Sequence, residues 1–344
     1  MHELNTKLLK ETASLLLTKG KGILAADESS PTCDKRLATV GVEGSTEMRR
    51  KYRNLLLEMP KLEDFVTGVI MYSETFWQKN DDDVQFPESL TKRGIIPGIK
   101  MDLGAKDFPG FEGEKLTIGL DDLPERAQEY FNVGARFGKW RAVIKIDEET
   151  GLPTEECIEA NADVLGRYAR IVQEAGLVPI VEPEVLLQGS HPIEKCEEVI
   201  SHVLEKVFEK LEEYRAYIPG VILKTSMVIS GDANPKETSA EEVAERTVKV
   251  LLEKVPKDIG GVVFLSGGQT PVEATAHLDA IAEKEPLPFE IAFSYARALQ
   301  EPVLRTWIGK EENVDSARIE FLKRLKLNQL ADDGDYDMSF EYID

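Results

Sequence analysis

The sequence has few histidines and cysteines, and this scarcity excludes several kinds of site. Its four histidines are scattered over 344 residues, and its three cysteines, Cys33, Cys157 and Cys196, have no CxxC spacing. Neither pattern suits a zinc site of clustered His or Cys. An odd, unspaced set of cysteines is typical of reduced residues in a cytoplasmic protein. We therefore expect no metal, no cofactor and a cytoplasmic location.

The sequence also lacks long hydrophobic runs and an excess of positive charge. No apolar run approaches the ~18 residues of a membrane span, and Met1–Asn5 shows no sign of a secretory signal. The net charge is -21, which makes nucleic acid and anionic membranes poor partners for the surface as a whole. An anionic substrate would have to be bound by a local cluster of Lys and Arg.

Apolar, strand-like runs alternate with helical patterns along the chain. The runs lie at 22–28, 65–72, 95–102, within 134–146, and at 177–185, 220–228, 260–268 and 289–297. Such alternation predicts parallel βαβ units, and eight strands favour a closed (β/α)8 TIM barrel of the α/β class. Because no linker or repeat divides the chain, we expect one domain, 1–344. It would carry an N-terminal helix (about 6–19) and a C-terminal helix with an acidic tail (about 316–344).

The predicted strand ends carry many ionisable side chains. In a (β/α)8 barrel the carboxyl ends of the strands form the active site. One charged strand end is commonplace, but charges on most of the strands indicate a functional cluster. The side chains concerned are Asp27, Glu28, Lys100, Asp102, Glu182, Glu184, Lys224, Ser266 and Arg297.

Lys224 lies inside an otherwise apolar run. Burying an unpaired ammonium is so costly that a lysine tends to lose its proton, and a desolvated amine can attack a carbonyl to form a Schiff base. The alternative is a lysine that reaches solvent from a strand end. Glu182 and Glu184 share one face of their strand. They could serve as acid and base with separated pKa values, or they could be a solvated pair.

Two groups of residues suit the binding of anions. Ser266, Gly267 and Gly268 follow the seventh strand, where these barrels commonly bind phosphate, and Arg297 could complete that site. A Gly-Gly pair is by itself more often only a turn. A second set of cations could hold another anion or simply be solvated: Arg36, Lys100, Lys139 and Arg141.

Several longer motifs occur in one order along nearly the whole chain, and together they resemble class I fructose-1,6-bisphosphate aldolase. The resemblance implies a metal-independent, reversible cleavage of fructose 1,6-bisphosphate to dihydroxyacetone phosphate and glyceraldehyde 3-phosphate. The motifs are GILAADES (22–29), GKWR (138–141), VPIVEPE (178–184), LK (223–224), FLSGGQ (264–269) and FSYARALQ (293–300).

The resemblance also implies roles for individual residues. Lys224 would be the Schiff-base lysine and Glu182 its acid–base group, Asp27 would act on the C4 hydroxyl, and Lys139 and Glu184 would support them. The phosphate on C1 would be bound by Ser266, Gly267, Gly268 and Arg297, and the phosphate on C6 by Lys100, Arg141 and Arg36.

Some features depart from the family pattern or conflict with the residue pattern. Lys139 can be catalytic only if the fourth strand is 135–139, whereas hydropathy favours 141–146. Thr225-Ser226 stand where animal enzymes have Pro-Asn, and Ala296 replaces a glycine. Tyr342 is not terminal, so we do not assign it the role of the terminal tyrosine of those enzymes.

The resemblance further implies a homo-oligomer, with a tetramer favoured, and Asp121 lies in a segment similar to a family interface. Three other functions remain open at this stage. They are another Schiff-base aldolase or transaldolase, a catalytically silent barrel that acts as a scaffold, and, least favoured, a metal-dependent aldolase.

Overall fold

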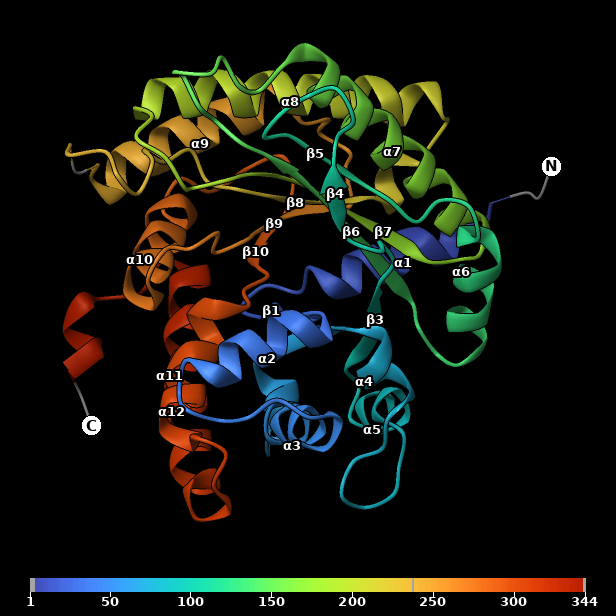
Figure 1. The fold of residues 1–344 in the computed structure, drawn as a ribbon, viewed down its shortest axis with the longest axis vertical. Helices are drawn as coiled ribbons and strands as arrows, with labels where there is room; N and C mark the ends of the chain where they lie inside the picture. The colour runs from blue at the N-terminus through green and yellow to red at the C-terminus, as the bar shows by residue number, and fades with distance from the viewer. Residues whose placement is uncertain (1–3, 237, 343–344) are drawn as a thin grey trace.

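Eight parallel strands form a nearly closed barrel in the computed structural model (Figure 1), which confirms the predicted fold class. The structure describes residues 4–236 and 238–342, so the expectations for residues 1–3 and 343–344 lie outside it. Neighbouring strands follow one another along the chain in the sheet. The barrel strands are β1 (Gly22–Ala26), β2 (Val66–Met71), β3 (Ile96–Lys100), β6 (Phe137–Ile144), β7 (Val178–Val185), β8 (Ile222–Thr225), β9 (Gly261–Phe264) and β10 (Ile291–Phe293).

Helices surround this barrel, and short 3-10 turns connect some of them. The sequence pattern did not indicate four of them, at Ser30–Ala38, Ser73–Trp77, Phe86–Lys92 and Arg297–Trp307. The helices are α1 (Thr6–Leu16), α2 (Ser30–Ala38), α3 (Thr46–Leu57), α4 (Ser73–Trp77), α5 (Phe86–Lys92), α6 (Leu123–Asn132), α7 (Glu155–Glu174), α8 (Ile193–Glu213), α9 (Ala240–Lys254), α10 (Pro271–Ala282), α11 (Arg297–Trp307) and α12 (Val314–Asp333). The 3-10 turns are η1 (Leu62–Asp64), η2 (Ile218–Gly220), η3 (Glu311–Asn313) and η4 (Met338–Tyr342).

A small hairpin, which is not among the strand-like runs of the sequence, follows β3. It consists of β4 (Ala105–Asp107) and β5 (Lys115–Thr117), paired antiparallel. The hydroxyl of Thr117 donates a hydrogen bond to the carbonyl oxygen of Arg141 (2.8 Å), so the hairpin lies against β6. It therefore supports the strand that carries two of the predicted site residues.

The conflict over the fourth barrel strand is resolved because β6 is longer than either expectation. Its first residues pair with β3, in a register that sets Lys139 beside Lys100. All eight residues, Phe137–Ile144, pair with β7. The strand thus includes both Lys139 and the apolar segment that follows it. Lys145 lies beyond the strand and pairs with Asp147 (2.8 Å).

The two ends of the barrel differ in what fills them. Apolar side chains of the strands form a cluster with α1, through Leu9, Ala13 and Leu16, and this cluster fills the end where the strands begin. Gly22 leaves room there for the ring of Phe293, which lies 2.2 Å from the position that a Cβ would occupy. The strands' carboxyl ends are consequently the open mouth of the barrel.

Among residues 4–236 and 238–342, no helix has both the length and the hydropathy needed to cross a membrane.

Candidate active site

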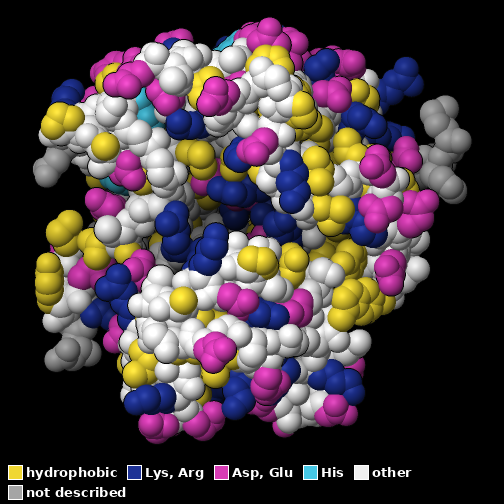
Figure 2. All heavy atoms as spheres, in the orientation of Figure 1, with side chains coloured by type: hydrophobic (Ala, Val, Ile, Leu, Met, Phe, Trp, Pro, Cys, Tyr) yellow, Lys and Arg dark blue, Asp and Glu magenta, His cyan; other side chains and the backbone are white. Residues whose placement is uncertain are grey.

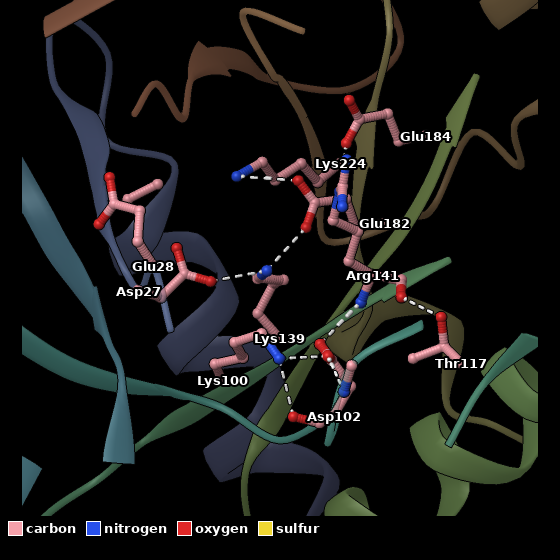
Figure 3. Close-up of polar contacts among 12 residues, drawn as sticks. Asp27, Glu28, Lys100, Asp102, Thr117, Lys139, Arg141, Glu182, Glu184 and Lys224 are labelled. Carbon is pink, nitrogen blue, oxygen red and sulfur yellow. Dashed lines mark hydrogen bonds and ion pairs between the residues drawn. The ribbon is translucent and has the colours of Figure 1, made fainter. Parts of the chain in front are cut away.

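Four side chains form a continuous chain of ion pairs inside the mouth of the barrel (Figure 3). Lys139 Nζ lies 2.7 Å from Asp27 Oδ2 and 3.0 Å from Glu182 Oε2. The other carboxylate oxygen of Glu182 lies 3.1 Å from Lys224 Nζ. All four residues are buried. The structure therefore brings together the two predicted lysines and two of the three predicted catalytic carboxylates.

The strands account for this convergence. Asp27 directly follows β1, while the other members of the chain lie on β6, β7 and β8. Side chains alternate between the inside and the outside of a barrel wall. Lys139, Glu182 and Lys224 each occupy an inward position on a separate strand, so their charged ends meet on the barrel axis.

Each charge in this chain is stabilised by its neighbours. Burial opposes ionisation of Asp27, but Lys139 and Lys224 outweigh it and hold the pKa of that carboxyl well below its usual range. Burial likewise opposes the charge on Lys139, but Asp27 and Glu182 raise its pKa well above the ordinary value. Glu182 is buried too, and Lys139 and Lys224 still lower its pKa. In the absence of substrate the carboxylates of Asp27 and Glu182 are thus ionised.

Glu182 and Glu184 face different cations, which differs from the expected interacting carboxylate pair. The carboxylate of Glu184 accepts a hydrogen bond from Arg141 Nε at 2.5 Å. Burial opposes the charge on Arg141, but Glu184 outweighs this effect and raises the pKa of the guanidinium. Each glutamate thus has its own cationic partners: Glu182 pairs with Lys139 and Lys224, and Glu184 pairs with Arg141.

The cations predicted to bind the far phosphate are held by acids at the rim. Lys100 pairs with Asp102, and Arg36 of α2 pairs with Glu28. Asp102 also accepts a hydrogen bond from the backbone N–H of Arg141 (3.2 Å). Sequence analysis named Asp102 among the charged strand ends but assigned it no catalytic or binding role. Its signal was its position two residues after Lys100, the same spacing that links Glu182 and Glu184.

The predicted phosphate loop has the backbone that an anion site requires. Gly267 and Gly268 have φ angles of 55° and 115°, a region that favours glycine. A Cβ on Gly268 would lie 3.1 Å from Arg297 Nη2, which places that guanidinium beside the loop. Burial, together with the positive charge of Arg36, lowers the pKa of Arg297. An anion that neutralises these cations would be bound favourably here.

Ser294 is a residue to which sequence analysis assigned no place in the site. It follows β10 and lines the cavity, and its buried hydroxyl has no hydrogen-bond partner among the described residues. Its position directly after the eighth strand was the available signal. Two residues later, Ala296 has a φ of -104°, which lies outside the left-handed region that favours glycine.

These residues line one cavity of about 1430 Å³. Figure 2 shows Lys and Arg side chains around a hollow near the centre of this face, in a protein whose net charge is -21. All the predicted site residues except Gly268 line this cavity: Asp27, Arg36, Lys100, Lys139, Arg141, Glu182, Glu184, Lys224, Ser266, Gly267 and Arg297. The described part of the chain contains no group of three or more His, Cys, Asp or Glu side chains placed to hold a metal ion.

Comparisons with known proteins agree along almost the full chain. A family model described as glycolytic, fructose-bisphosphate aldolase class-I, matches residues 8–342. A probable fructose-bisphosphate aldolase class 1 of Xanthomonas axonopodis pv. citri is 49% identical over 324 residues, which cover 94% of this chain and 96% of that protein. Fructose-bisphosphate aldolase 5, cytosolic, of Arabidopsis thaliana is 47% identical over 329 residues, or 95% of this chain and 91% of that protein.

A solved structure is similar to the same extent. It is fructose-bisphosphate aldolase from Plasmodium falciparum in complex with TRAP and a small-molecule inhibitor. Its TM-score is 0.95 at 45% sequence identity, and the match covers 96% of each chain.

Proposed function

Because the chain belongs to the class I fructose-bisphosphate aldolase family, we propose that Lys224 forms a Schiff base with the C2 carbonyl of its substrate. The protein is an aldolase, a lyase of glycolysis and gluconeogenesis that reversibly cleaves fructose 1,6-bisphosphate. Its products are dihydroxyacetone phosphate and glyceraldehyde 3-phosphate. The Schiff base accounts for how that cleavage proceeds without a metal.

The proposed reaction assigns a proton to each carboxylate. Lys224 first passes a proton to the neighbouring carboxylate of Glu182. The resulting amine adds to C2, and Glu182 returns that proton as the carbinolamine loses water, leaving an iminium. Asp27 takes the proton of the C4 hydroxyl as the C3–C4 bond breaks. Glyceraldehyde 3-phosphate leaves, and the electron pair of the broken bond forms an enamine. Protonation at C3 consumes one proton, which balances the proton that Asp27 took and restores its carboxylate. Addition of water to the iminium then releases dihydroxyacetone phosphate and restores Lys224.

Phosphate groups at both ends of the substrate fit the two cationic regions of the mouth. The C1 phosphate would be bound by Ser266, Arg297 and the backbone N–H groups of Gly267 and Gly268. The C6 phosphate would be bound by Lys100, Arg141 and Arg36. Each of these cations now pairs with a carboxylate and would replace part of that ion pair with a contact to the phosphate.

One observation carries this proposal: the ion-pair chain that ends on Lys224. The ammonium lies 3.1 Å from Glu182, which is within reach for proton transfer. The same glutamate contacts Lys139, which contacts Asp27. A nucleophile, an acid–base group and a base for C–C cleavage therefore share one buried site with a phosphate loop beside it.

Borohydride trapping tests the mechanism. The protein is incubated with dihydroxyacetone phosphate, reduced and mapped by peptide mass spectrometry, with Lys224→Met as the control. We expect a stable adduct on Lys224 in the wild type and none in the variant. An adduct on another lysine would overturn the assignment of the site. The absence of any adduct in the folded protein would overturn the mechanism and favour a silent scaffold.

Substrate preference distinguishes the proposed enzyme from the remaining alternative, another Schiff-base aldolase or a transaldolase. A second Schiff-base aldolase or a transaldolase would share Lys224 but would not need the second cationic region. We expect fructose 1,6-bisphosphate to be cleaved with a higher kcat/KM than fructose 1-phosphate. Equal or better use of the monophosphate would favour the alternative enzyme.

We further propose a homotetramer, supported by an exposed apolar surface beside Asp121. Leu103 and Ile118 are 55% and 42% exposed and are joined by a backbone hydrogen bond of 2.9 Å. Exposed apolar residues that lie together are common at protein interfaces. Sedimentation velocity of the wild type and of Leu103→Lys would test this: we expect a tetramer that the variant weakens, and a wild-type monomer would contradict the assignment.

We propose a cytoplasmic location and treat the chain as one domain. The cysteines are free and buried, which suits a reducing compartment, and one of the relatives above is named as cytosolic. Fractionation of the source cells with antibody detection would test the location, and enrichment with a membrane or secreted fraction would contradict it.

A further inference from the structure

The first and last strands of the barrel, β1 and β10, are joined differently from the other neighbouring strands. We call the boundary between these two strands the seam. Each pair of neighbours from β1 round to β10 forms a parallel ladder, whereas β10 and β1 stand at the two ends of the strand order. Across this seam, the backbone N–H of Ala25 donates to the carbonyl of Tyr295 at 3.1 Å, and no ladder is formed between the described residues of the two strands.

Two important parts of the site lie on opposite sides of this seam. Asp27 follows β1, and Arg297 begins α11 after β10. The proposed function gives Asp27 the C4 hydroxyl and Arg297 the C1 phosphate of the same substrate molecule. The distance between these groups must therefore be fixed even though the ladder that would fix it is missing.

Gln300 crosses the seam with its side chain. It lies three residues after Arg297 on α11, and it is 1% exposed. Its Nε2 donates to the carbonyl oxygen of Ala25 at 2.6 Å, two residues before Asp27. Both backbone groups of Ala25 are then bound across the seam, one by Tyr295 and the other by a side-chain amide.

The other end of the same amide is also held. The hydroxyl of Tyr52, on α3, donates to Gln300 Oε1 at 3.1 Å. The ring of Tyr52 stacks on Trp307 of α11, with centroids 5.6 Å apart and an interplanar angle of 22°. The orientation of the amide is thus set by two partners, and it cannot turn away from Ala25 without losing both.

We propose that Gln300 is a positioning residue of the aldolase reaction, in that its amide replaces the missing ladder and fixes Asp27 relative to Arg297. This inference rests on the proposed function. Gln300 lines the cavity, but Ala25 and Tyr52 engage both ends of its amide, so we assign it no contact with the reacting atoms. It acts on the alignment of the C4 hydroxyl with Asp27 once the substrate is anchored through its C1 phosphate.

The geometry separates this effect from Schiff-base formation. Lys224 lies on β8, which pairs with β7 and β9 away from the seam. Loss of the Gln300 amide should therefore leave the attack on C2 unchanged and impair the step in which Asp27 acts. A displacement of a reacting group by about 1 Å can cost on the order of 100-fold in rate.

Three variants and two activities test the proposal. Gln300→Met keeps the shape and removes both hydrogen bonds, and Gln300→Asn keeps an amide but shortens it. Gln173→Met is the matched control, because Gln173 is an equally buried glutamine whose amide joins Tyr217 and Gly220, on the segment before β8. The activities are cleavage of fructose 1,6-bisphosphate and exchange of the C3 proton of dihydroxyacetone phosphate, which needs Lys224 but no C4 hydroxyl.

We expect both Gln300 variants to lose at least about tenfold in kcat for cleavage, with C3 exchange and the Lys224 adduct within twofold of wild type. Gln173→Met should leave the ratio of the two activities unchanged. A parallel fall in cleavage and exchange, or no fall in either, would overturn the positioning role. If wild-type protein gave no adduct on Lys224, the proposed function would fail first and this inference with it.

If Gln300→Met does not fold, Gln300→Asn decides the question by the same ratio. A folded Gln300→Asn with wild-type cleavage would overturn the proposal.

Discussion

At the scale of single residues, the two buried lysines of the ion-pair chain have different surroundings. Lys139 contacts two carboxylates, Asp27 and Glu182, which raise its pKa and keep it an ammonium ion. An ammonium has no lone pair with which to attack a carbonyl. Among the described residues, Lys224 forms an ion pair with one carboxylate, that of Glu182, which it shares with Lys139. This contrast is why we place the nucleophile at 224 and an electrostatic role at 139.

Replacing Lys139 should change the pH dependence of the enzyme. In Lys139→Met, Asp27 and Glu182 lose the cation that opposes the effect of their burial, so the pKa values of both carboxyls should rise. Protonation would then begin at higher pH. We expect kcat to fall on the order of 100-fold, and the acidic limb of the kcat/KM profile to move to higher pH.

The control for this variant is a lysine near the end of the same strand. Lys145 pairs with Asp147 outside the site, so Lys145→Met should keep both the rate and the position of the acidic limb. An acidic limb that stayed in place in Lys139→Met, measured between pH 5 and pH 9 on protein of unchanged circular dichroism, would contradict the role of Lys139.

At the scale of elements, hydropathy predicted the barrel well because its strands are buried on both faces. Elements that it missed have physical reasons for a weak pattern. Helix α11 begins directly after the eighth strand and contains Pro302, α2 has a proline at its start, and α4 is only five residues long. The fourth barrel strand was misjudged because a buried lysine interrupts its apolar run.

The part of the site that could be predicted from the sequence is the part formed by charged residues at the strand ends. Charged residues at those ends pointed to Asp27, Glu182 and Lys224, whereas the catalytic role of Lys139 came only from the family resemblance. What the sequence could not supply was pairing: that Glu184 belongs to Arg141, or that the Gln300 amide reaches a carbonyl 275 residues earlier. Such contacts follow from the closure of the barrel, and no local pattern encodes them.

The phosphate loop makes a prediction at this scale. In Gly268→Ala the new methyl would lie 3.1 Å from Arg297 Nη2, at a φ of 115°. We expect Arg297 to be displaced and the KM for dihydroxyacetone phosphate in the condensation direction to rise about tenfold, since one charge-assisted contact contributes roughly 1.5–3 kcal/mol. The KM for glyceraldehyde 3-phosphate should change less.

Gly134→Ala provides the matched control for this loop. Gly134 has a φ of 113°, and no atom lies within 4 Å of the position of its Cβ. It imposes the same backbone strain away from the site, so both KM values should stay at their wild-type level. Equal increases for the two substrates in Gly268→Ala would argue against a specific role in binding the C1 phosphate.

At the scale of the whole molecule, chemistry and stability are concentrated at opposite ends of the barrel. The mouth holds buried charges, whereas α1 and the end of α12 close the other end. There Asp332 is fully buried, with Oδ2 accepting a hydrogen bond from the backbone N–H of Gly20 (2.9 Å) and Oδ1 without a partner among the described residues. Burial raises the pKa of this carboxyl to about 7, an effect that nearby Lys19 only partly offsets.

This buried acid should make the stability of the fold depend on pH while activity does not. Below about pH 4 the carboxyl is neutral in both the folded and the unfolded chain. Between pH 4 and pH 7 only the unfolded chain ionises, so stability falls as the pH rises, by at most about 4 kcal/mol. Asp332→Asn removes this loss, and its melting temperature should exceed that of the wild type by several degrees at pH 8 but match it near pH 4. The kcat should be unchanged, because the residue lies at the far end of the barrel.

The exposed neighbour serves as control: Asp333→Asn should show no such pH-dependent difference. A melting-temperature difference for Asp332→Asn that is constant across this range would show that the carboxyl does not titrate there, and would place the origin of its effect in packing.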